Sequence, residues 1–272
     1  MTMSKKTGSW FGVACVFVLF LPFARAETAR EMLDQAKAVN DAREPKDVTQ
    51  RFTMKLVDSR GGERVRELVA YAKEFPDDQT RAITFFQSPP EVKGVGFLSW
   101  SHADRDDDQW LYLPELKRVR QITANTRRQS FQGSDFSYED LELFDDIRDW
   151  TEEDAASTIV RDEAVDGVPC TVIELVPKGK DIEYGKFIVW LDRKDSTFRK
   201  VEFYHKKDGK LLKVLTLAEF RTVGQIPTPH RLEMVNAKKG TKTQMDFAEV
   251  SYNQGLADDV FTQRTLEQGR VR

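Results

Sequence analysis

One segment near the N-terminus has the spacing of apolar residues that is typical of an amphipathic helix. Between Thr28 and Ala42, apolar residues recur at three- and four-residue intervals and therefore share one helix face. They are Ala29, Met32, Leu33, Ala36 and Val39. Glu44-Pro45 ends the pattern, because a proline ring disfavours helical backbone in the residue before it. The sequence predicts a helix over residues 28–42.

From about Asp47 onward, apolar and polar residues alternate, which indicates strands with one buried face. This alternation recurs along the chain and predicts about ten strands, among them residues 48–57, 168–176 and 197–206. The turn at Asp208-Gly209 favours a hairpin, since both residues tolerate positive φ angles. No strand–helix–strand alternation is present. We therefore expect a mainly β (α+β) protein with a single, strongly curved, barrel-like antiparallel sheet.

Two parts of the chain depart from this alternation. Residues 123–154 are less regular and predict a long loop with one or two short helices, ordered only by the packing of its aromatic side chains. Residues 258–266 predict a last short helix. The strands therefore fall into two groups, one on each side of the irregular middle.

The first 26 residues have the features of a secretory signal peptide. Lys5 and Lys6 precede an uncharged, largely apolar run from Trp10 to Phe23, which is shorter than the roughly 20 residues needed to span a bilayer as a helix. Ala24-Arg25-Ala26 then provides small residues at the −3 and −1 positions of a cleavage site. We expect cleavage before Glu27, an exported single domain over residues 27–272, and localisation in the periplasm.

Charge and cysteine content narrow the possible functions. Loss of residues 1–26 removes three basic residues and no acidic ones, so the net charge changes from −3 to −6. A mildly acidic chain argues against nucleic acid as a partner. Cys170 is the one cysteine beyond residue 26 and lies in an alternating apolar strand, where a buried structural thiol is expected.

Candidate catalytic chemistry is sparse. His102, His205 and His230 are far apart and form no metal-spaced pair. The alternating Asp104, Asp106 and Asp108 lack the glycine and the closing glutamate of a calcium loop. We expect no enzymatic activity, no metal and no cofactor. A hydrolase that uses Asp135 and Glu139 as an acid/base pair is the weakest alternative, because nothing in the sequence fixes their separation.

The densest basic stretch lies just before the irregular middle of the chain. It consists of Lys117, Arg118, Arg120, Arg127 and Arg128. Such a stretch suits contact with anionic lipid headgroups or with an acidic partner. An edge strand kept soluble by its charges explains it equally well.

Large apolar side chains are concentrated in the same part of the sequence. If they line the concave face of a curved sheet, they form a pocket for acyl chains. The expected lining residues are Phe86, Leu98, Trp100, Trp110, Tyr112, Phe131 and Phe136. The alternative is that they fill an ordinary core without a cavity.

Two sequence blocks resemble a known family. They are Trp110-Leu-Tyr-Leu-Pro-Glu-Leu-Lys-Arg-Val-Arg and Gly133-Ser-Asp-Phe-Ser-Tyr-Glu-Asp-Leu. The pair is similar to the LolA-like outer-membrane lipoprotein-sorting proteins, in the longer subgroup that often accompanies exporters of the RND/MMPL type. The resemblance implies an unclosed β-barrel whose mouth is covered by helices, with an apolar cavity for acyl chains.

These observations favour a carrier or chaperone. The expected cargo is a lipid or lipidated protein, passed from an inner-membrane transporter, such as an RND/MMPL-type exporter, to the outer membrane with transient membrane contact. The helix over residues 28–42 and the loop around residues 133–141 are the expected movable lids. The alternative is a non-catalytic envelope sensor or scaffold that docks on a transport complex through the basic stretch.

Overall fold

The computed structural model describes residues 27–76, 79–102, 105–179 and 181–271. The predicted signal peptide and its cleavage site at Ala26 lie outside these residues. Within them, no helix has the length and apolar character needed to cross a bilayer.

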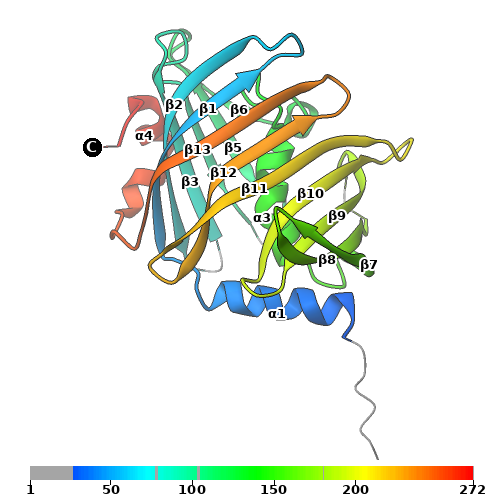
Figure 1. Ribbon diagram of the computed structural model, residues 1–272. Helices are drawn as coiled ribbons and strands as arrows, with labels where there is room; N and C mark the ends of the chain where they lie inside the picture. Colours follow the sequence, from blue (N-terminus) through cyan, green and yellow to red (C-terminus); the bar gives the residue numbers. More distant parts are fainter. Residues whose placement is uncertain (1–26, 77–78, 103–104, 180, 272) are drawn as a thin grey trace, which may run out of the picture.

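Thirteen strands form one antiparallel sheet (Figure 1). Their bounds are β1 Asp47–Val57, β2 Glu63–Phe75, β3 Gln79–Ser88, β4 Gly96–Trp100, β5 Asp108–Leu113, β6 Arg118–Ile122, β7 Ala155–Val165, β8 Val168–Pro177, β9 Tyr184–Asp192, β10 Thr197–His205, β11 Leu211–Val223, β12 Ile226–Asn236 and β13 Thr241–Tyr252. The spatial order is β6-β5-β4-β3-β2-β1-β13-β12-β11-β10-β9-β8-β7. Because the order ends at β6 and β7, the curved sheet is not closed. This confirms the predicted mainly β class and the unclosed barrel.

Within the described part of the chain, four helices and a 3-10 turn accompany the sheet. They are α1 Ala29–Asp41, α2 Ala124–Arg127, α3 Tyr138–Asp149, η1 Asp258–Phe261 and α4 Gln263–Gln268. Helix α1 confirms the predicted N-terminal helix, and it starts with a capping box in which Thr28 and Glu31 satisfy each other's backbone N–H groups. The predicted hairpin turn at Asp208-Gly209 joins β10 to β11, with Gly209 at a φ of +65°.

The estimate of about ten strands was too low. The clearest omission is β6, where only Val119 and Ile122 are apolar and no alternation marks a strand. It forms by pairing with β5, in a register that places Tyr112 opposite Val119. The basic stretch therefore begins on an edge strand, as one of its two interpretations proposed.

The two faces of the sheet are covered by different parts of the chain (Figure 1). The concave face packs against α1, α3 and the loop before α3, in the largest core cluster. The convex face of the β2–β5 region packs against η1 and α4 through Val260, Phe261 and Leu266. A smaller cluster on the same side of β8 and β9 contains Cys170, whose predicted burial is confirmed.

Asp47 anchors residues 253–271, which follow β13 and which we call the C-terminal segment, to the convex face. Its buried carboxylate accepts backbone N–H groups of Gln254, Gly255 and Leu256 at 2.7, 2.8 and 3.1 Å. These bonds fix the turn by which the chain leaves β13 and passes to η1. A single side chain therefore satisfies three donors that would otherwise lie unpaired beside the sheet.

Asp47→Ala is expected to lower the free energy of unfolding by roughly 2–5 kcal/mol, because it leaves partly buried N–H groups without acceptors. Asp58→Ala is the matched control. Asp58 also accepts two backbone N–H groups, from Arg60 and Gly62, but its side chain is exposed and water can replace it. Urea unfolding of both variants measures the difference, and equal losses would contradict the anchoring role of Asp47.

Candidate functional site

The concave face is occupied by the connection between the two edge strands. We call residues 123–154, which join β6 to β7, the plug segment. Helix α3 of this segment lies within the curvature of the sheet (Figure 1). The buried apolar side chains of the plug segment belong to the largest core cluster, and they are Phe131, Phe136, Tyr138, Leu143, Ile147 and Trp150.

Aromatic rings make up much of the contact between the plug segment and the sheet. Phe131 lies 5.9 Å from Phe86 on β3 and 5.4 Å from Phe97 on β4, measured between ring centroids. At the other end, Trp150 lies 5.5 Å from Phe187 on β9. These tilted and edge-on pairs add specific geometry to the apolar contact. The plug segment therefore fills the concavity with side chains of the kind that would otherwise contact a bound acyl chain.

Buried polar contacts also hold the plug segment, so the expectation that aromatic packing alone orders it was incomplete. The carboxylate of Asp140 accepts a 2.5 Å hydrogen bond from the Tyr184 hydroxyl of β9 and pairs with the ammonium of Lys213 on β11. It also accepts the backbone N–H of Ser137 at 2.6 Å and so caps α3. Burial and the Asp140 carboxylate together raise the pKa of Tyr184 well above its ordinary value.

Two further carboxylates of the motif that begins at Gly133 have partners of their own. Asp135 accepts hydrogen bonds from the hydroxyls of Thr241 and Thr243 on β13. Glu139 accepts the backbone N–H of Glu183 at 3.2 Å and lies 3.6 Å from Arg128. Burial raises the pKa of Glu139. The motif thus connects the start of α3 to several strands, and the proposed acid/base pair of Asp135 and Glu139 is engaged in separate contacts.

Glu142 is a buried carboxyl of the plug segment whose pKa is shifted far from its ordinary value. Burial, followed by the negative charge of Asp107, raises its pKa to about 8, and the charges of Asp146 and Asp106 act in the same direction. The guanidinium of Arg127, 3.6 Å away, lowers the pKa but does not offset these effects. The folded protein therefore keeps this proton up to a higher pH than the unfolded chain, whose ordinary value is 4.5.

Because the folded state binds the extra proton, Glu142 makes the free energy of unfolding fall as pH rises from about 4.5 to about 8. Glu142→Gln should remove this contribution, so the variant gains stability relative to the wild type as pH rises through that window. Urea unfolding at about pH 5 and about pH 8 measures the change. The exposed Glu67→Gln is the control and should follow the wild type. A constant difference between Glu142→Gln and wild type would contradict the prediction.

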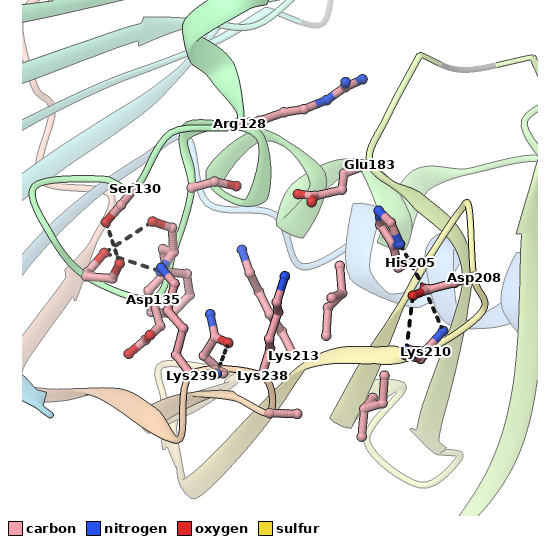
Figure 2. Close-up of a pocket in the computed structure, with 17 residues that line it drawn as sticks. Arg128, Ser130, Asp135, Glu183, His205, Asp208, Lys210, Lys213, Lys238 and Lys239 are labelled. Carbon is pink, nitrogen blue, oxygen red and sulfur yellow. Dashed lines mark hydrogen bonds and ion pairs between the residues drawn. The ribbon is translucent and has the colours of Figure 1, made fainter. Parts of the chain in front are cut away.

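The two ends of the curved sheet are covered differently. At one end lies α1, where Asn40 donates to the carbonyl of Ser196 at 2.9 Å and Lys37 lies 3.4 Å from Asp149 of α3 (Figure 1). At the other end, between the plug segment and the turns of β10–β11 and β12–β13, lies a pocket of about 570 Å³, which we call the mouth pocket (Figure 2). Phe136 lines this pocket and also belongs to the apolar cluster beneath it.

The structure divides the residues expected to line an acyl pocket between the two faces of the sheet. Phe86, Phe131 and Phe136 lie in the concave cluster. Leu98 and Trp110 lie in the convex cluster beneath the C-terminal segment, with Trp100 and Tyr112 packed against it. On β4 and β5, Phe97 and Leu111 are buried in the concave cluster, and Leu113 packs against it. The unbroken apolar runs Val95–Leu98 and Trp110–Leu113 are a signal for burial on both faces.

The basic stretch is also divided. Lys117, Arg118 and Arg120 are exposed at edge strand β6 and the turn before it. Arg127 is mostly buried between Asp106 and Glu142, at 3.0 and 3.6 Å. Arg128 is half-exposed, pairs with Asp181 at 2.9 Å, and lines the mouth pocket.

Sequence reasoning did not identify Tyr184, Lys213, Thr241 or Thr243 as part of the site. Their partners lie 44 to 108 positions away in the chain, so no local pattern reveals them. One local signal was available, since Ser137 and Asp140 have the spacing of a capping box and mark the start of α3.

Comparisons with known proteins agree with this architecture. A family model described as "-like: Uncharacterized protein" matches residues 78–268, which is more than half of the chain. No curated protein matches the sequence at a significant level.

Three solved structures are similar. A domain from Vibrio parahaemolyticus described as an outer membrane lipoprotein-sorting protein is 31% identical, with a TM-score of 0.78 over 88% of this chain and 98% of its own. A DUF1329 family protein from Desulfovibrio piger is 26% identical, with a TM-score of 0.80 and the same coverage. A LolA superfamily protein from Nitrosomonas europaea shares the fold at 20% identity, with a TM-score of 0.64 over 88% of this chain and 100% of its own.

The unclosed sheet, the plug segment within it and the 31% identity over nearly all of the Vibrio domain lead to one assignment. The chain belongs to the family of outer-membrane lipoprotein-sorting proteins that includes this Vibrio domain, and it has the LolA-like fold.

Proposed function

We propose that the protein is a periplasmic carrier that holds the acyl chains of a lipid or lipidated protein against the concave face of its sheet. The observation that carries this proposal is the plug segment. It fills the concavity with aromatic side chains, yet it is joined to the sheet at both ends and held by a small set of buried polar contacts around the start of α3. Displacement of these side chains would open an apolar surface without unfolding the sheet.

The energy of acyl burial fits a carrier that needs a partner for release. Each methylene moved out of water contributes about 0.8 kcal/mol, so a chain of about 14 methylenes contributes roughly 11 kcal/mol before the cost of displacing the plug segment. Spontaneous escape of such a cargo would be slow. We propose that an inner-membrane transporter of the RND/MMPL type loads the carrier and that the outer membrane receives the cargo.

Native mass spectrometry with organic extraction tests this proposal. The full chain is expressed, exported and purified gently from a periplasm. About one retained lipid per chain is expected, because a buried acyl chain dissociates slowly. A ligand-free mass, unchanged after incubation with membrane extract, would contradict the carrier function. The intact mass also reports whether residues 1–26 have been removed.

A sensor or scaffold is the second candidate, and the exposure of Lys117, Arg118 and Arg120 at edge strand β6 and the turn before it favours it. Reversal of these three charges should abolish recovery of an envelope partner and leave bound lipid in place. Loss of the lipid with retention of the partner would count against this candidate.

A further inference from the structure

The mouth pocket is rich in positive charge, although the whole chain is acidic. Five of its 17 lining residues are lysine or arginine and three are acidic, whereas the chain has a net charge of −3 (Figure 2). The basic residues are Arg128, Lys210, Lys213, Lys238 and Lys239. The local excess of positive charge indicates a site for a negatively charged group.

Part of this charge is compensated. Lys213 pairs with the buried Asp140, and Arg128 pairs with Asp181 and Glu139, so the uncompensated charge lies on the turn between β12 and β13. Asp135 is occupied by two threonine hydroxyls, and Asp208 contacts His205 at 2.8 Å and Lys210 at 3.6 Å. The side chains of Lys238 and Lys239, in the turn between β12 and β13, have no hydrogen bond or ion pair with any residue that the structure describes.

The lysines lie close to the apolar concave face, so one ligand could contact both. Figure 2 shows Lys213, Lys238 and Lys239 close together along one wall of the mouth pocket, with Asp135 beside them. Phe136 lines the mouth pocket and also belongs to the apolar cluster of the concave face. The pocket and the concavity are therefore adjacent, and one amphiphilic molecule could occupy both.

We propose that the mouth pocket binds a phosphate-type oxyanion, and that in the carrier this oxyanion is the headgroup of the cargo lipid. The inference rests on the proposed function and assigns the cargo to anionic lipids. The ammonium groups of Lys238 and Lys239 donate charge-assisted hydrogen bonds to the phosphate oxygens. The acyl chains continue past Phe136 toward the concave face.

Isothermal titration calorimetry with three probes tests this assignment. Dodecyl phosphate carries both parts of the ligand, dodecyl maltoside carries the chain with a neutral headgroup, and inorganic phosphate carries the oxyanion alone. Each amphiphile is used below its micelle concentration. Wild-type protein is expected to bind dodecyl phosphate at least about tenfold more tightly than dodecyl maltoside, and added salt should reduce the difference.

Lys238→Glu/Lys239→Glu is expected to remove the preference for dodecyl phosphate and leave dodecyl maltoside affinity unchanged. Both lysines are exposed, so the fold should persist. Lys93→Glu/Lys194→Glu is the matched control, because it makes the same charge change at two exposed turn residues outside the pocket and should keep the preference. A retained preference in the pocket variant would overturn the proposal.

The probes also distinguish a lipid headgroup from free phosphate as the bound oxyanion. They further distinguish failure of the oxyanion site from failure of the carrier function. Weak binding of inorganic phosphate beside tight binding of dodecyl phosphate supports a lipid headgroup, whereas equal binding of both supports a free-phosphate site and overturns the headgroup assignment. Equal affinity of the wild type for the two amphiphiles would overturn the oxyanion site but leave the carrier intact. Failure of both amphiphiles to bind would count against the carrier itself.

Discussion

Lys213→Met is expected to lower the free energy of unfolding by about 3–5 kcal/mol, since it leaves Asp140 buried without its cationic partner. Only 11% of the Lys213 side chain and 1% of the Asp140 side chain are exposed, so little water reaches the Asp140 carboxylate once its cationic partner is lost. The Tyr184 hydroxyl and the Ser137 N–H still contact the carboxylate, but neither carries a compensating charge. Urea unfolding gives the difference from wild type.

A second pair provides the control for this prediction. Lys242 and Glu233 lie 2.9 Å apart on neighbouring strands, with 43% and 30% of their side chains exposed. Lys242→Met should cost no more than about 1 kcal/mol, because solvent screens a surface pair. Asp140→Asn/Lys213→Met, which removes both charges, should recover part of the loss of Lys213→Met. If Lys213→Met costs no more than Lys242→Met, Asp140 does not depend on Lys213 for its charge.

Phe136→Asp is expected to reduce retained lipid at least about tenfold, because it places a carboxylate on the path between the mouth pocket and the concave face. Phe136 is 4% exposed and lines the pocket, so the new carboxylate can reach water without unfolding the sheet. Phe136→Leu keeps an apolar side chain there and should retain the lipid. Native mass spectrometry of the purified variants measures the retained amount.

The comparison with the convex face makes this test specific. Trp110 was expected in the same pocket as Phe136 but lies beneath the C-terminal segment, at 9% exposure. Trp110→Leu should therefore reduce stability and leave retained lipid unchanged. Equal loss of lipid in Trp110→Leu and Phe136→Asp variants of equal foldedness would show that the loss reports general destabilisation.

Local patterns in the sequence predicted the fold well. The three- and four-residue spacing after Thr28 predicted α1, and two-residue alternation predicted most strands, since each property belongs to a short stretch of chain. Strand β6 was missed because it is fixed by its pairing with β5 and has no alternation of its own. The family resemblance of two sequence motifs predicted that the barrel is unclosed.

The site was harder to predict, for a geometric reason. Successive strand residues point to opposite faces, so the side on which Leu98 or Trp110 lies depends on which face the C-terminal segment later covers. When both faces of a strand are buried, the pattern of apolar residues does not show which face a given side chain occupies. The contacts of Asp140 with Tyr184 and Lys213 are likewise products of the folded topology.

The pairing of β1 with β13 bears on how the protein is made. Every other pair in the sheet joins strands that are consecutive in sequence, so the β1–β6 and β7–β13 meanders can form as their residues emerge from the ribosome or from a secretion channel. Strand β1 must wait for the last strand of the chain. During that interval the backbone N–H and C=O groups on the side of β1 opposite β2 form a free edge that other chains can pair with. Formation of the sheet therefore ends with the pairing of β1 and β13. A chaperone that binds the free edge of β1 would protect the unfinished chain from pairing with other chains.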